Sequence, residues 1–336
     1  MPPSGDDIIT PSGDVDSSSG GEFEPLEFSL DEPGSLYQSI GSNIYKHSYE
    51  NGRRYHFFRN GKYPIPNDDL EQNREDLKHV LVQELTGGTL VHAPIGDSPQ
   101  KIIDLGTGTG SWAIEAGDRY PSAEVVGVDL SPIQPVWVPP NVKFIIDDVE
   151  DEWLTSAGTY DYAHLRNLMP FVKKVPQFLA RCYENLRPGG WIESCDFDGT
   201  AHCDDGSMPG DWPLSRFWTR LAEALKRLGH HDVQIAPHLG AALTAAGFVR
   251  VSCVRAYKVP VGTWPADPTL RLIGLYMRQV VEDFLDAAAA KPYRALGMSE
   301  AEVAGFMDAV HASLRARTVH SYCKYYVWVA QKPYDG

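Results

Sequence analysis

Short β-branched runs alternate with segments of helical spacing along the middle of the chain. Five runs predict buried strands, at 101–105, 124–129, 141–147, 160–166 and 190–197. A Gly-rich turn follows the first run, and residues 111–119 then have the spacing of a helix that ends at Tyr120-Pro121. Strands that alternate with helices in this way predict an α/β fold with a doubly wound, mostly parallel sheet.

Further elements are predicted on both sides of these runs. Asn67, Asp68 or Asp69 can cap a helix that continues to about residue 86, where Gly87-Gly88 stops it. Helical spacing returns at 212–229 and 235–246, and strands at 248–259 and 320–332 bring the expected sheet to seven. About sixty residues of helical spacing separate these last two strands, which predicts an inserted helical cap.

These patterns divide the chain into five parts. They are a disordered acidic tail at 1–35, an N-terminal lid and helix at 36–98, an α/β core at 99–259, the helical cap at 260–319, and the last strand of the core at 320–336. The tail is predicted from its Ser, Gly, Pro and Asp content, which cannot form a core. The lid is predicted from aromatic and basic residues that alternate over 49–63, although binding of a nucleotide phosphate is an alternative.

Composition narrows the class of protein. The formal net charge is −15 over 336 residues, and nine of the excess carboxylates lie in the first 35 residues, so direct nucleic-acid binding is disfavoured. The sequence contains neither an 18-residue apolar run nor a secretory signal, which predicts a cytoplasmic or nuclear protein that does not enter a membrane. Five cysteines without a C-x-x-C pair favour reduced thiols, and we expect no metal site.

The most specific motif is IIDLGTGTG, in which Asp104 ends the first strand and Gly106, Gly108 and Gly110 follow at alternate positions. Glycines allow a tight turn and a close approach of a ligand to the backbone at the start of a helix. Dinucleotide sites use G-x-G-x-x-G, and here Ser111 takes the place of the third glycine. Because a carboxylate repels a pyrophosphate, the motif favours a ligand whose head group carries an ammonium.

Acidic residues also follow the next two strands. Asp129 ends the second strand, where a carboxylate can accept hydrogen bonds from two ribose hydroxyls; an ordinary loop carboxylate is the alternative. The third strand ends in Asp147-Asp148-Val149, and a carboxylate there can accept the exocyclic amine of an adenine or cap a helix.

The acids and the glycine loop together resemble the class I S-adenosylmethionine-dependent methyltransferases, which have a Rossmann-like fold. Longer strings resemble a fungal branch of that family, which includes the velvet-complex regulator of secondary metabolism and small-molecule methyltransferases. These strings are YENGRRYHFFRNGKYPIPND, IIDLGTGTGSWAIE, VVGVDLSPIQPVWVPPNVKFIIDDVEDEW, YDYAHLR, LRPGGWIE and CDDGSMP.

The resemblance implies S-adenosylmethionine as the cofactor and assigns residues to its parts. Asp104, Thr107 and the three glycines would hold the methionine end, Asp129 and Leu130 the ribose, and Asp148 and Val149 the adenine. Arg166 would lie near the methionine carboxylate or the acceptor, and Arg54 and Tyr55 of the lid would face the cofactor.

The acceptor is less defined by the sequence. At the fourth strand's end the chain reads HLRNLMPF. It lacks the Asn/Asp-Pro-Pro-Tyr loop with which methyltransferases of nucleic-acid bases hold the exocyclic amine, so methylation of a base is disfavoured. His164, Arg166 and His202 are candidate catalytic residues, although a lone histidine is more often a packing or capping residue. We therefore expect methylation of a small molecule at O, N or S. A velvet-type regulator that acts through protein partners, a homodimer, and a scaffold for a rearrangement without methylation stay open.

Overall fold

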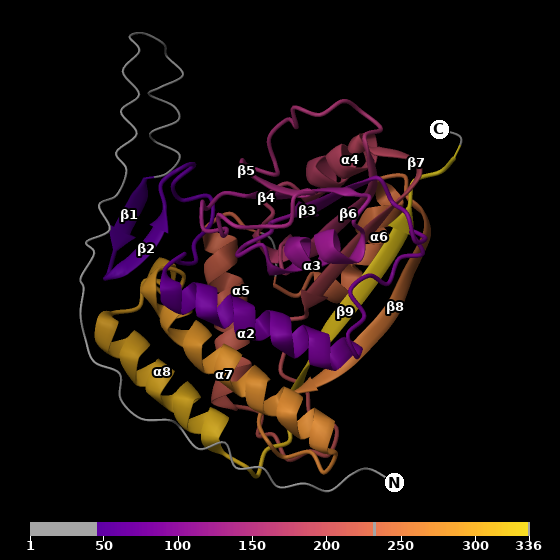
Figure 1. The fold of residues 1–336 in the computed structure, drawn as a ribbon. Helices are drawn as coiled ribbons and strands as arrows, with labels where there is room; N and C mark the ends of the chain where they lie inside the picture. Colours follow the sequence, from indigo (N-terminus) through magenta and orange to yellow (C-terminus); the bar gives the residue numbers. More distant parts are fainter. Residues whose placement is uncertain (1–45, 231–232, 335–336) are drawn as a thin grey trace, which may run out of the picture.

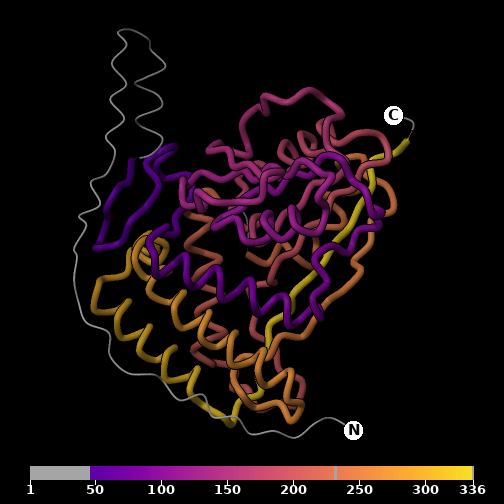
Figure 2. Tube along the Cα trace, in the orientation of Figure 1, coloured from indigo at the N-terminus to yellow at the C-terminus, as the bar shows by residue number. Residues whose placement is uncertain are grey.

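The computed structural model describes residues 46–230 and 233–334, and its centre is a seven-stranded sheet (Figures 1 and 2). The strands are β3 (Lys101–Leu105), β4 (Glu124–Asp129), β5 (Val142–Ile146), β6 (Tyr160–Arg166), β7 (Leu186–Phe197), β8 (Val249–Pro260) and β9 (Tyr322–Gln331). Their order is β5-β4-β3-β6-β7-β9-β8, and β9 runs in the opposite direction to the other six strands of this sheet. The predicted doubly wound, mostly parallel sheet of seven strands is confirmed.

Helices cover the two faces of the sheet, as the alternation of side chains along its strands requires. They are α2 (Asp69–Thr86), α3 (Ser111–Arg119), α4 (Val175–Asn185), α5 (Pro213–Arg227), α6 (Leu239–Ala245), α7 (Pro268–Ala290) and α8 (Glu300–Arg315), with short 3₁₀ helices η1 (Met169–Phe171), η2 (Ala236–His238) and η3 (Tyr293–Leu296). Ile102 packs with α3, whereas Ile103 packs with α4 and α6 on the opposite face. Neighbouring residues of one strand thus belong to two separate hydrophobic cores.

A third core joins the helices that follow β7 and β8. Buried side chains of α5, α7 and α8 pack together there with Leu81 and Val82 of α2. In Figure 1, α2 lies beside α7, with α8 further from the sheet. The two helices α7 and α8 and the 3₁₀ helix η3 occupy the chain between β8 and β9, and α8 begins with a capping box of Ser299 and Glu302.

The N-terminal part and one crossover differ from the prediction. Residues 47–56 form a hairpin of β1 (His47–Glu50) and β2 (Arg53–His56), which turns at Asn51-Gly52. Helix α4 between β6 and β7 was not predicted. The tail expected at 1–35, the adjoining residues 36–45 and the end of the chain at 335–336 lie outside the described residues.

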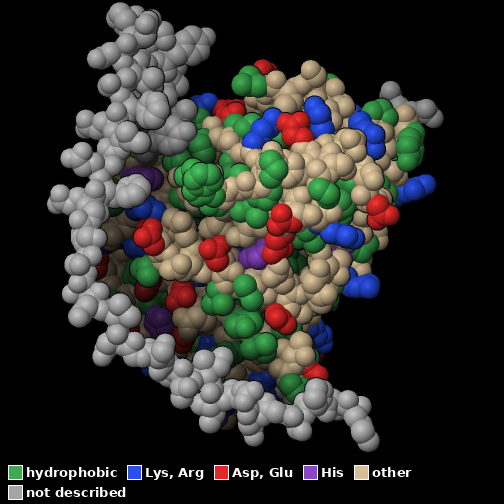
Figure 3. Space-filling view, viewed as in Figure 1, with side chains coloured by type: hydrophobic (Ala, Val, Ile, Leu, Met, Phe, Trp, Pro, Cys, Tyr) green, Lys and Arg blue, Asp and Glu red, His purple; other side chains and the backbone are tan. Residues whose placement is uncertain are grey.

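The surface carries side chains of both charges. On the face shown in Figure 3, acidic and basic side chains are interspersed rather than gathered by sign. None of the helices in the described part of the chain is long and apolar enough to cross a membrane.

Gly110 provides a test of the packing between the glycine loop and β5. Its φ of 86° is left-handed, and a Cβ atom would lie 2.4 Å from Cζ of Phe144, whereas Gly88 has a φ of 77° with open space around it. We expect Gly88→Ala to lower the free energy of unfolding by about 1–2 kcal/mol through backbone strain. Gly110→Ala should cost a further 1–3 kcal/mol, roughly, because it overpacks the core.

Denaturant unfolding of the two variants without ligand measures this difference. Equal losses in Gly110→Ala and Gly88→Ala would contradict the close contact with Phe144.

Candidate functional site

A cavity opens at the edge of the sheet where the parallel strands end. One side of it, here called the loop half, is formed by residues after β3, β4 and β5: Gly106, Gly108, Thr109, Asp129, Leu130, Ser131, Ile133, Asp147 and Val149. The other side, here called the apolar chamber, is lined by Phe171, Phe197, Trp218, Leu221, Leu225, Val233, Met277, Val280, Val281 and Phe284. The cavity therefore combines a backbone-rich polar side with a hydrophobic one.

The glycine loop connects β3 to α3 and faces the cavity. Gly106 has a φ of 72° and turns the chain beside Leu168, whose Cδ1 would lie 3.0 Å from a Cβ atom at this position. The amide of Gly108 donates to Oδ2 of Asp129 at 2.9 Å. The loop after β3 and the carboxylate after β4 are thus joined directly, which places Asp129 at the floor of the loop half.

Asp129 is the most perturbed acid of the loop half. Burial raises its pKa to about 6, although the amides of Ser131 and Gly108 oppose this shift. Each amide donates at 2.9 Å, one to each carboxylate oxygen. A carboxylate has about four lone-pair sites, so it can also accept from two hydroxyls of a bound ribose.

Asp104 does not line this cavity. Its Oδ2 accepts from the hydroxyl of Thr107 at 2.6 Å, and its Oδ1 lies 2.7 Å from Nδ1 of His164. His164 is itself buried and stacks on Trp112 with ring centroids 3.7 Å apart. Asp104, Thr107 and His164 therefore support the loop from beneath and do not reach the ligand space directly.

At the end of β5 the structure brings Asp147 to the cavity in place of the expected Asp148. Lys62 places its ammonium 2.9 Å from Oδ2 of Asp148 and 2.9 Å from Oε2 of Glu150. Asp147 and Val149 line the loop half. Asp148 is buried against Lys62 instead and is absent from the cavity lining.

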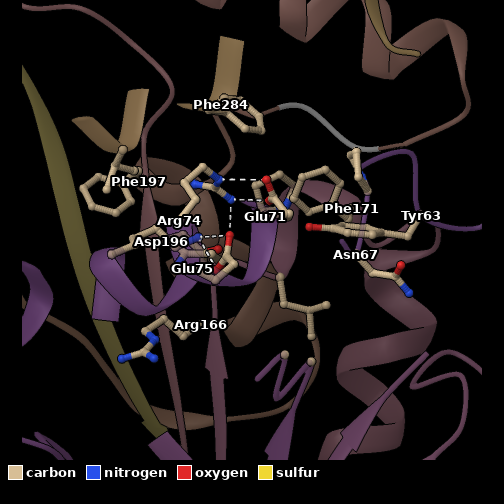
Figure 4. A pocket seen from close by; sticks show the side chains of 18 of the residues that line it. Tyr63, Asn67, Glu71, Arg74, Glu75, Arg166, Phe171, Asp196, Phe197 and Phe284 are labelled. Atoms are coloured by element: carbon tan, nitrogen blue, oxygen red, sulfur yellow. Dashed lines mark hydrogen bonds and ion pairs between the residues drawn. The ribbon is translucent and has the colours of Figure 1, made fainter. Parts of the chain in front are cut away.

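Helix α2 covers the cavity with a row of charged side chains that the sequence analysis did not identify (Figure 4). Arg74 forms a two-pronged ion pair with Glu71, at 3.0 and 2.6 Å, and also contacts Glu75. Lys78 donates to Glu75 at 2.7 Å. Burial alone would raise the pKa of Glu75, but Lys78 and Arg74 hold it at about 2. The spacing i, i+3, i+4 and i+7 was the available signal, because it places the four charges on one helix face.

The hairpin of β1 and β2 lies outside the cavity lining. Arg54 donates to the carbonyl oxygen of Asn67 at 2.8 Å and contacts Asp69, so it anchors the hairpin to the start of α2. Tyr55 is buried, and the ammonium of Lys291 lies 5.3 Å from its ring centroid. Arg54 and Tyr55, expected beside the cofactor, are therefore occupied elsewhere. The covering segment begins later, at Tyr63, which packs edge-on against Phe171.

The remaining candidates are divided between the cavity and its surroundings. Arg166 lines the cavity, but its guanidinium bonds Nδ1 of His79 at 2.7 Å and points away from the charged row in Figure 4. His202 bonds Oδ2 of Asp198 at 2.6 Å and is absent from the cavity lining. In the described part of the chain, no three His, Cys, Asp or Glu side chains are arranged to hold a metal ion.

The fold and this cavity define a class I S-adenosylmethionine-dependent methyltransferase. A family model described as a methyltransferase domain matches residues 74–252, and the chain belongs to this family. Its cofactor is S-adenosylmethionine, and the glycine loop with Asp129 is the part of the cavity suited to the cofactor's amino-acid and ribose groups.

Fungal relatives cover nearly the whole chain. Methyltransferase pytC of Aspergillus terreus is 37% identical over 92% of this chain and 96% of its own. The secondary metabolism regulator LAE1 of Cochliobolus heterostrophus is 34% identical over 84% and 94%. The protein-methionine methyltransferase laeA of Emericella nidulans is 30% identical over 84% and 76%. A solved Haemonchus contortus phosphoethanolamine N-methyltransferase with S-adenosyl-L-methionine is 17% identical over 77% of this chain and 52% of its own, with a TM-score of 0.44.

Asp129 should make cofactor binding depend on pH. The ribose hydroxyls bind the ionised carboxylate, whose pKa is about 6 because of burial. Affinity for S-adenosylhomocysteine is then nearly complete at pH 7, is halved near pH 6 and falls about tenfold between pH 7 and pH 5. Asp129→Asn should weaken binding at pH 7 by about tenfold or more and remove most of the pH dependence.

Calorimetric titration of both proteins across this pH range measures the effect. A variant that kept the affinity and the pH profile of the original chain would remove Asp129 from the ribose site.

The two acids after β5 form a matched pair for a second test. Asp147→Ala should weaken S-adenosylhomocysteine binding about tenfold, because a hydrogen bond to an ionised group contributes about 1.5–3 kcal/mol, while the melting temperature stays near its original value. Asp148→Ala should instead lower the melting temperature, because Lys62 loses a buried partner.

Calorimetry and thermal unfolding on each variant separate the two roles. Weaker binding with unchanged stability in Asp148→Ala would return the adenine contact to Asp148.

Proposed function

We propose that this protein methylates a small, largely apolar molecule of fungal secondary metabolism at an oxygen, nitrogen or sulfur atom. The observation that supports this proposal is the apolar chamber, which continues directly from the loop half of the cavity. Most of its lining residues come from α5, α7 and the end of β7, so the acceptor space lies between the sheet and the helical layer. Apolar pockets with a few polar groups are the usual binding sites of small ligands.

The main task of the protein in this reaction is to align the acceptor atom, the methyl carbon and the sulfur. Methyl transfer from a sulfonium is an in-line displacement, in which the acceptor atom attacks the methyl carbon and the sulfur leaves as a neutral thioether. Holding the two reactants in line contributes about 7–11 kcal/mol in well-oriented systems. Residues of the loop half would hold the cofactor, and the apolar chamber would hold the acceptor, with α2 limiting the entry of water.

A regulatory role is the second candidate, and its support comes from the comparisons. The chain is 34% identical to the secondary metabolism regulator LAE1 over 84% of its length. In this role a velvet-type protein would act through protein partners, and a peptide side chain would enter the chamber if it were methylated. The two roles differ in what must fit inside the cavity, which makes them separable by experiment.

Filling the apolar chamber should abolish small-molecule turnover and leave the cofactor site intact. Val280 lines the chamber from α7, whereas Leu272 is exposed on the same helix. Val280→Trp should therefore remove methylated products by occluding the acceptor, with little change in S-adenosylhomocysteine affinity, and Leu272→Trp should behave like the original protein.

Mass spectrometry provides the measurement. Purified protein and S-adenosylmethionine are incubated with hydroxylated aromatic compounds and, separately, with methionine-containing peptides, and products heavier by one CH₂ unit are sought. Methylation of peptides alone, unaffected by Val280→Trp, would contradict the small-molecule function.

A further inference from the structure

Asp196 is a buried carboxylate at the wall of the cavity, and one of its oxygens lacks a close hydrogen bond among the described residues. It is the penultimate residue of β7, it is 1% exposed, and it lines the cavity. The hydroxyl of Ser194 donates to its Oδ2 at 2.8 Å. Its Oδ1 makes no hydrogen bond of normal length and angle with the described residues, although the backbone amides of Leu168 and Met169 lie near this carboxylate. A carboxylate has about four lone-pair sites, so Asp196 can still accept a hydrogen bond from a ligand in the cavity that it lines.

Asp196 lies between the loop half and the apolar chamber. Phe197 beside it belongs to the apolar chamber, and Asn167 and Leu168 on the neighbouring strand end adjoin the glycine loop. Along the sheet, Asp129 follows β4, the glycine loop follows β3, and β6 separates β3 from β7. Strands lie about 4.8 Å apart, so roughly 10 Å separates the glycine loop from Asp196. That interval can hold a methyl-bearing sulfur followed by an acceptor atom and its proton.

We propose that Asp196 faces the transferred methyl group and accepts the proton of an acceptor that carries an O–H or N–H group on an apolar body. This inference rests on the proposed small-molecule function and names the acceptor class for it. The hydroxyl or amine would donate to Oδ1 of Asp196 while the rest of the molecule lies against Phe197 and Phe284.

The reaction balances with these groups alone. The acceptor oxygen or nitrogen forms a bond to the methyl carbon, and the bond from that carbon to the sulfonium sulfur breaks with its electron pair passing to sulfur. The acceptor proton passes to the carboxylate of Asp196. The sulfonium and the carboxylate each lose one charge, so no charged species is created inside the cavity and no further co-reactant is consumed.

The charged neighbours of Asp196 leave it able to take a proton near neutrality. Burial raises its pKa to about 6, and the hydroxyl of Ser194, the backbone amides of Met169 and Leu168 and the ammonium of Lys78 on α2 oppose that shift. Arg166 at the end of β6 lines the same cavity. The thiol of Cys323 and the phenol of Tyr325, both on β9, have pKa values raised well above their usual range by burial, so they stay neutral near pH 6.

The charge of the sulfonium provides a test that needs no acceptor. S-adenosylmethionine carries a positive sulfur, whereas S-adenosylhomocysteine has the same adenosine and amino-acid groups around a neutral thioether. A cation near Asp196 favours its ionised form, so binding of S-adenosylmethionine at pH 6 should release about half a proton more than binding of S-adenosylhomocysteine. Calorimetry in two buffers of different ionisation enthalpy measures this difference directly.

Two variants locate the effect. Asp196→Asn should bind both ligands with equal proton release, and its binding of S-adenosylhomocysteine shows that it is folded. Asp198→Asn is the matched control, because Asp198 is buried two residues further along the chain but bonds His202 outside the cavity lining. It should keep the difference between the ligands. A difference that persists in Asp196→Asn, or that is missing in the original protein, would overturn the proposal.

Turnover separates this inference from the proposed function. With an acceptor that the original protein methylates at O–H or N–H, Asp196→Asn should lower kcat by about 10²–10⁴-fold, with the KM for S-adenosylmethionine nearly unchanged. Unchanged kcat, or turnover of acceptors without an ionisable proton only, would refute the role as a base. A third outcome is that no small molecule is methylated while the two ligands still differ in proton release. That result would refute the proposed function and would keep Asp196 assigned next to the sulfonium.

Discussion

Four paired charges on one face of α2, here called the ion network, allow this helix to cover the cavity. Glu71, Arg74, Glu75 and Lys78 all line it, and leaving one of these buried charges without its partner would cost about 3–5 kcal/mol. Each charge has an opposite neighbour within the same helix, so the network is satisfied before a ligand arrives. Arg74 also lies over the ring of Phe284 at 4.9 Å, which joins the network to the apolar chamber. Cover and chamber are therefore one packed unit.

This arrangement explains why the hairpin of β1 and β2 serves the site at a distance. Arg53 forms an ion pair with Asp68 at 2.6 Å, and the carboxylate of Asp68 also caps α2. The hairpin thus fixes where α2 begins, and the phase of the helix then decides which side chains point down into the cavity. A residue in the hairpin can position the site without touching a ligand.

The sequence predicted the core of the fold because its signals are local. The first three strands of the sheet, β3 to β5, are β-branched runs, and IIDLGTGTG needs only a strand, a turn and a helix in succession. The same reasoning placed Gly106, Gly108 and Asp129 at the cavity, and the family resemblance added Leu130 and Val149. Helix α4 was not predicted, although its buried residues 175, 178, 179 and 182 have helical spacing.

What the sequence did not predict depends on contacts between distant segments. The choice of Asp147 over Asp148 is made by Lys62, more than eighty residues away, and Asp104 turns to His164, on the neighbouring strand. Arg54 and Tyr55 matched a family string, but which partners they would contact depended on the start of α2 and on Lys291. Spacing along the chain carries no information on such choices, since each was decided by tertiary packing.

The cavity also has an electrostatic asymmetry that suits a sulfonium cofactor. Its lining contains five carboxylates, those of Glu71, Glu75, Asp129, Asp147 and Asp196, against three basic groups, those of Arg74, Lys78 and Arg166. With these groups ionised the lining is negative, and a ligand with one net positive charge is favoured over its neutral product. The preference is strengthened by the low dielectric of the apolar chamber, where an uncompensated charge is poorly solvated. Transfer of the methyl group removes that positive charge, so the reaction itself weakens the hold of the cavity on the spent cofactor.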